Sequence, residues 1–61
     1  MQVYVNETPM DLYPGMKVRH ALIKAGLLEE VESGKCRALD AWGNEVGLDG
    51  ALTAEMKIYV K

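Results

Sequence analysis

The chain has 61 residues, of which 49% are hydrophobic, and its formal net charge at pH 7 is −2. This length supports one domain, residues 1–61, with a single core, and the near-balanced charge favours neither nucleic acid nor an anionic membrane as a partner. One cysteine and one histidine exclude an internal disulfide and supply too few ligands for a stabilising metal site. We therefore expect a small domain held together by core packing alone.

No segment has the pattern of a membrane span or a targeting signal. The longest apolar run is far shorter than the roughly 20 residues that span a bilayer. An alternating strand pattern begins at Gln2, with no basic and apolar leader before it, so no signal peptide is expected. The lone Cys36 fits a reducing compartment, and together these features predict a cytoplasmic protein.

Residues 1–5 and 9–13 each alternate between apolar and polar side chains, which predicts two strands with one buried face. A polar turn at residues 6–8 joins them, without the Asn-Gly pair that is the strongest hairpin signal. Pro9 has no N–H for the ladder and predicts an edge position for the second strand. The side chains expected to face the core from this hairpin are Met1, Val3, Val5, Met10 and Leu12.

The clearest predicted element is a helix that follows the Pro-Gly turn at positions 14 and 15. Its apolar residues recur at the i, i+3, i+4 and i+7 spacing of an amphipathic helix. They are Val18, Ala21, Leu22 and Ala25. Gly26 follows the stripe and suits a left-handed C-terminal cap. Lys17 cannot accept a hydrogen bond at the N-cap position, so a frayed or tight first turn is expected.

The second half of the chain predicts three further strands. Residues 27–35 show no clear pattern, although their apolar side chains could close one end of the core. Residues 36–42 form the next predicted strand, with Leu39 and Ala41 on one face and Ala38, Asp40 and Trp42 on the other.

Gly-Asn at positions 43 and 44 predicts a two-residue hairpin, and residues 45–48 are expected to pair back. Leu52 is expected to fill the core, and residues 56–61 to form the last strand. The inward side chains predicted for that strand are Met56, Ile58 and Val60.

The predicted order is ββαβββ, an α+β domain in which one mixed sheet packs on one helix. The first and last strands can lie parallel in the centre, because the intervening chain is long enough for a crossover. This order resembles the ubiquitin-like β-grasp superfamily, as do Pro-Gly-Met-Lys-Val at 14–18, Ala-Leu-x-x-Ala-Gly at 21–26 and Leu-x-x-x-Met-x-Ile-x-Val at 52–60. The nearest likeness is to the small sulfur-carrier proteins of thiamine and molybdopterin biosynthesis.

The resemblance implies functions that can be checked against this sequence. Sulfur carriers end in a flexible Gly-Gly whose carboxylate is adenylated and becomes a thiocarboxylate, whereas the printed sequence ends Ile-Tyr-Val-Lys. Carrier activity would therefore require a tail beyond Lys61. Plant-type ferredoxins share the scaffold but hold their cluster with four cysteines, and this chain has one.

Few residues are suited to catalysis or metal binding. His20 has no adjacent nucleophile or second ligand in the pattern, so a solvated helix-surface histidine is expected. Cys36 has only Lys35 and Arg37 to lower its pKa and is expected to be structural or incidental. The acidic group at 29, 30 and 32 lacks the spacing of a calcium loop. We expect no enzymatic activity, no cofactor and no metal.

The strongest functional signal is aromatic. The chain has no Phe, yet it has three Tyr and one Trp. They are Tyr4, Tyr13, Trp42 and Tyr59. By alternation all of them are expected to point off the helix-covered face. Tyr4 and Tyr59 are expected to meet on the open face of the sheet, with Lys57, Lys61 and Gln2 around them.

Such a set is typical of interfaces, so a non-enzymatic module that binds a protein partner or itself is expected. Tyrosines that only shield a small sheet are an almost equal alternative. A sulfur-carrier relative is a further alternative. A small-ligand binder is the weakest, because one helix on one sheet leaves little room for a pocket of about 300 Å³.

Overall fold

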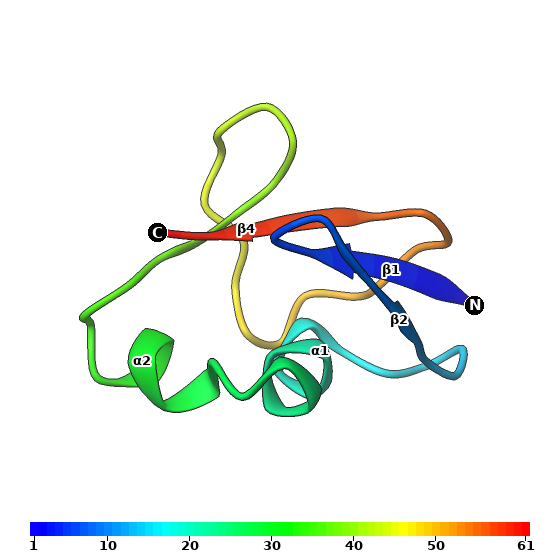
Figure 1. Ribbon diagram of the computed structural model, residues 1–61, viewed down its shortest axis with the longest axis horizontal. Helices are drawn as coiled ribbons and strands as arrows, with labels where there is room; N and C mark the ends of the chain where they lie inside the picture. The colour runs from blue at the N-terminus through cyan, green and yellow to red at the C-terminus, as the bar shows by residue number, and fades with distance from the viewer.

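In the computed structural model, which describes residues 1–61, two parallel strands form the centre of a four-stranded sheet. These are β1 (Gln2–Val5) and β4 (Lys57–Val60). The edge strands are β2 (Thr8–Asp11) and β3 (Ala38–Leu39), and the order across the sheet is β2-β1-β4-β3. Both helices lie on the same side of the sheet (Figure 1). The parallel central pair, the edge position of Pro9 and the β-grasp topology are confirmed.

The turn between β1 and β2 is tighter than the sequence suggested. Asn6 and Glu7 both have positive φ, 50° and 69°, as in the two-residue type I′ turn whose twist matches a hairpin. The Asn6 side chain also fixes the neighbouring strand, because its Oδ1 accepts a hydrogen bond from the N–H of Val60 at 2.9 Å.

The predicted helix is α1 (Val18–Ala25), and Gly26 ends it as expected with φ 75°. The N–H of Gly26 donates to Ile23 and that of Leu27 to Leu22, which is a Schellman motif. The start of the helix takes one of the two expected forms. The first turn is tight but not frayed, because carbonyls from the loop at 48–50 accept its free N–H groups.

A second helix, α2 (Leu28–Glu32), was not predicted. At five residues it is too short to show a helical stripe. The sequence nevertheless placed its role correctly, since the apolar side chains of this region pack against the core. They are Leu27, Leu28 and Val31.

The segment after α2 contains the main corrections. β3 has only two residues, and its buried side chain is Ala38, at 1% exposure, whereas Leu39 and Ala41 were expected to face inward. A register shift of one residue reverses both faces of a strand. The expected strand at 45–48 is reduced to one bridge between Leu39 and Glu45.

The hairpin tip is also one residue longer than predicted. The N–H of Asp40 donates to the carbonyl of Asn44, and the N–H of Gly43 donates to the carbonyl of Asp40 at 3.1 Å. Gly43 has φ 84°. This is the three-residue loop in which a left-handed glycine follows the turn, in place of the expected Gly-Asn turn.

Nine buried side chains form the core between the sheet and α1. They are Val3, Val5, Leu12, Val18, Ala21, Leu22, Ala38, Leu52 and Ile58. The predicted helix stripe is confirmed, except that Ala25 is only half-buried. The two helices are both too short to cross a bilayer.

Candidate interaction surface

The open face of the sheet brings Tyr4 and Lys57 together across the central strands. The parallel register of β1 and β4 places their Cα atoms opposite each other. Tyr59 lies two residues further along β4, so it is diagonal to Tyr4 rather than beside it. Lys57 therefore lies at the place where the two tyrosines were expected to meet.

Tyr4 is held by a loop residue rather than by Tyr59. Its hydroxyl donates to Glu55 Oε2 at 3.3 Å and lies 3.5 Å from Gln2 Oε1. The negative charge of Glu55 raises the pKa of Tyr4, and partial burial and the hydrogen bond act in the same direction. A shallow hollow on this part of the face is lined by Tyr4, Glu7, Glu55 and Lys57.

Glu55 owes its position to an uncommon backbone conformation. Its φ is 65°, in the left-handed region that side chains other than glycine and asparagine rarely adopt. Its N–H donates to the carbonyl of Gln2 at 2.7 Å, which fixes the loop before β4 against β1. Backbone strain of this kind is often found at functional sites.

Trp42 is the most exposed large apolar side chain, at 85%, and it lies at the tip of the hairpin after β3. The Asp40 carboxylate shapes this tip, because its Oδ1 accepts hydrogen bonds from the N–H groups of Trp42 and Asn44, each at 2.9 Å. An aspartate bonded to its own turn in this way ends a strand and redirects the chain.

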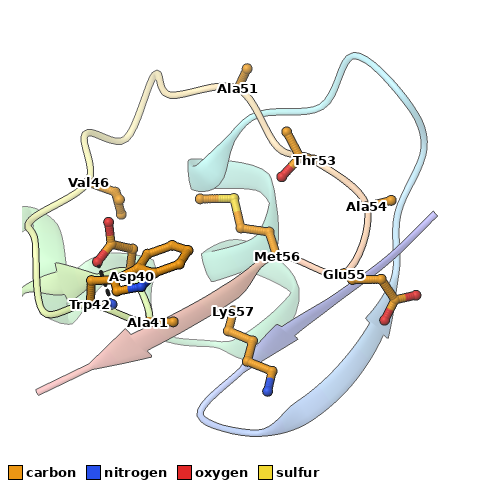
Figure 2. A pocket seen from close by; sticks show the side chains of 10 residues that line it. All are labelled: Asp40, Ala41, Trp42, Val46, Ala51, Thr53, Ala54, Glu55, Met56 and Lys57. Atoms are coloured by element: carbon orange, nitrogen blue, oxygen red, sulfur yellow. Dashed lines mark hydrogen bonds between the residues drawn. The ribbon is translucent and has the colours of Figure 1, made fainter.

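A hollow of about 540 Å³ separates this hairpin from the segment at 51–57. Figure 2 shows the side chain of Met56 extending into it toward Trp42 and Val46, while Lys57 and Glu55 lie along one side. The sequence predicted little room for a hollow above about 300 Å³. That expectation was wrong, because the chain leaves the sheet at Asp40 and does not cover the start of β4.

Trp42 also faces a second, smaller hollow of about 380 Å³, which it shares with Leu39, Tyr59 and Lys61. The three hollows adjoin. Glu55 and Lys57 line both the shallow hollow beside Tyr4 and the 540 Å³ hollow, and Trp42 lines both the 540 Å³ and the 380 Å³ hollows. We call this continuous surface the aromatic face. Its defining residues are Tyr4, Trp42, Glu55, Met56, Lys57 and Tyr59.

Tyr13 does not join this surface. It is 75% exposed and lines a separate groove of about 240 Å³ beside α1, together with Met16, His20 and Ile23. Its placement with the other aromatic residues was wrong, because β2 ends at Asp11 and the strand alternation does not extend to residue 13. Two residues of the aromatic face, Glu55 and Met56, were not predicted.

The other residues considered for catalysis or metal binding lie outside any cluster of reactive side chains. His20 is an exposed helix-surface residue, as expected, and its Nδ1 accepts a hydrogen bond from the N–H of Lys17 at 2.8 Å. Cys36 has a free, half-buried thiol, and its backbone N–H donates to the carbonyl of Glu30. His, Cys, Asp and Glu side chains nowhere gather in a group of three or more that could hold a metal ion.

Comparison of the chain with protein-family models, with curated proteins and with solved structures gives no match. The topology of the sheet and the geometry of the aromatic face are therefore the grounds for a functional assignment.

Proposed function

We propose that this chain is a non-enzymatic β-grasp module, related to the ubiquitin-like proteins, that binds a protein partner through the aromatic face. The observation that carries the proposal is the position of Trp42. Its side chain is 85% exposed between two hollows and is not part of the core. Exposed aromatic side chains beside a pocket are typical anchors of interfaces.

The surroundings of Trp42 support this assignment. Tyr59 lies on one side and the half-buried Met56 on the other, so apolar surface continues across the hairpin and β4. Tyr4 and Lys57 supply polar groups at the edge of the same surface. An apolar centre with a polar rim is the usual composition of a protein interface.

Affinity capture from a lysate of the source organism tests the proposal. We expect Tyr4→Ser combined with Tyr59→Ser to lose a partner that the wild-type chain retains. Tyr13→Ser is the control, because it removes a tyrosine from outside the aromatic face that is more exposed than Tyr4 or Tyr59. The proposal fails if the double variant remains folded and retains every partner or self-contact of the wild type.

A sulfur-carrier role is the second candidate, and the position of β4 favours it. This central strand runs to Val60, so residues following Lys61 would leave from the end of the sheet (Figure 1). The reading frame after Lys61 tests this role. A Gly-Gly terminus there would favour the carrier role, and capture of an adenylating enzyme alone would support it independently.

The hollow beside Trp42 also makes a small-ligand binder a specific alternative. Its volume of about 540 Å³ lies within the usual range for ligand pockets. Thermal unfolding with a panel of metabolites distinguishes a small-ligand binder from a protein-binding module. A ligand that fills the hollow raises the melting temperature without any protein partner.

A further inference from the structure

The start of β4 has an unpaired backbone edge. The carbonyls of Met56 and Ile58 accept hydrogen bonds from the N–H groups of Tyr4 and Asn6 at 2.8 and 2.9 Å. Backbone groups alternate in direction along a strand, so the N–H and C=O of Lys57 point away from β1, toward the side of β3.

β3 does not reach these groups. It pairs with β4 only at residues 59 and 60, and no backbone hydrogen bond joins the hairpin to Lys57. The cause is the turn at Asp40, whose carboxylate binds the N–H groups of Trp42 and Asn44 and curls the chain away. The sheet therefore has a gap of one residue beside Lys57.

The same gap opens into the hollow lined by Trp42, Val46 and Met56. A strand that paired with Lys57 would lie where β3 would have continued, with a side chain directed toward these apolar groups. Main-chain pairing at a sheet edge and a pocket for one side chain are the two elements of peptide recognition by strand addition.

The charges around the gap indicate which peptide fits. Three carboxylates line the hollows on either side of Lys57, from Glu7, Asp40 and Glu55, against the single ammonium group of Lys57. Tyr4 adds an aromatic ring to the hollow that Glu7 and Glu55 line. A cationic side chain is attracted both by the carboxylates and by the ring.

We infer that the partner contributes an extended peptide segment that pairs with the backbone of Lys57. This segment places one apolar side chain in the hollow beside Trp42 and a neighbouring Lys or Arg against Tyr4, Glu7 and Glu55. The inference rests on the proposed function and specifies the part of the partner that binds.

A displayed library of random heptapeptides, selected on the wild-type chain and depleted on Trp42→Ala, tests the inference. We expect enriched peptides to combine an apolar residue with Lys or Arg. A synthetic copy of an enriched peptide should lower the hydrogen-exchange rate of the Lys57 amide at least tenfold. N-methylation of the peptide at one backbone position, which removes one N–H, should abolish binding. Tyr13→Ser should bind the peptide as the wild type does.

Several outcomes would overturn the inference. They are the absence of enriched peptides, an enriched peptide that leaves Lys57 exchange unchanged, and concentration-dependent protection of Lys57 without peptide, which would identify a second copy as the occupant. If protein capture still depends on Tyr4 and Tyr59 in any of these cases, the inference fails and the proposed function stands. If capture is also indifferent to those residues, both fail.

Discussion

The N–H of Val18, the first residue of α1, donates to the carbonyl of Gly50 at 3.0 Å. The N–H of Arg19 donates to Leu48, and the guanidinium of Arg19 pairs with Asp49 at 2.6 Å. The loop before β4 thus replaces the side-chain cap that Lys17 cannot provide. The start of the only long helix depends on the C-terminal half of the chain.

This relationship predicts that the loop is sensitive to crowding at Gly50. A Cβ there would lie 3.1 Å from the Gly47 carbonyl and 3.5 Å from Val18 Cγ2. We expect Gly50→Ala to lower the free energy of unfolding by about 1 kcal/mol. Gly47→Ala is the control, because its Cβ meets nothing within 4 Å. Urea unfolding compares them, and equal stabilities would contradict the close packing of the loop at Gly50 against the start of α1.

The core predicts a large effect at Leu22. This side chain is fully buried in the centre of the helix stripe, so Leu22→Ala is expected to cost about 2–5 kcal/mol. A domain of this size often has a total stability of about 5 kcal/mol, so the variant can unfold entirely. Ile23→Ala, at a site that is 55% exposed, should change little. A cost at Leu22 below about 0.5 kcal/mol in thermal or urea unfolding would refute the buried face.

The β1–β2 turn predicts a stabilising substitution. Glu7 adopts φ 69°, which glycine tolerates without a side-chain clash. Glu7→Gly creates the Asn-Gly pair favoured in type I′ turns and is expected to raise the free energy of unfolding by about 0.5–1 kcal/mol. Glu7→Ala removes the same carboxylate but keeps the unfavourable φ, so it should show no such gain. Equal stability of the two variants would argue against this turn.

Tyr4 predicts a pH dependence. Its pKa is raised above 10.0, chiefly by the charge of Glu55, so the folded state favours the neutral phenol. The resulting stabilisation is present below pH 10 and is lost as pH rises through the higher, folded-state pKa, because the unfolded chain releases this proton first. Glu55→Gln should lower the pKa of Tyr4 toward 10.0, as followed by NMR titration of its ring. An unchanged pKa would contradict the Tyr4–Glu55 contact.

Much of the fold follows from patterns that the sequence displays openly. Two patterns predict the core: the i, i+3, i+4 spacing of Val18, Ala21 and Leu22, and the alternation around Val3 and Ile58. All five side chains are buried, because the periodicity of apolar residues marks the face that packs inward. The parallel centre follows from the long crossover between β1 and β4.

The aromatic face was harder to predict, because tertiary contacts and turn chemistry decide it. The side-chain bonds of Asp40 end β3 early, and this opens the hollow beside Lys57. The reversed faces of β3 follow from its pairing with β4, which places Ala38 opposite Val60. The positive φ of Glu55 has no signal in a sequence that offers no glycine there. Trp42 and Tyr59 were predicted from composition and strand alternation, whereas Glu55 and Met56 were not predicted as part of this surface.

The central claim is that the aromatic face binds a protein partner, and the affinity of the captured partner for Trp42→Ala tests it most directly. Because an aromatic anchor typically contributes 2 kcal/mol or more, isothermal titration calorimetry should show at least about a 30-fold loss of affinity relative to the wild type. Tyr13→Ala should lose less than about threefold, since rim or distant substitutions cost little. Equal affinities of Trp42→Ala and the wild type, with the fold retained, would contradict the claim.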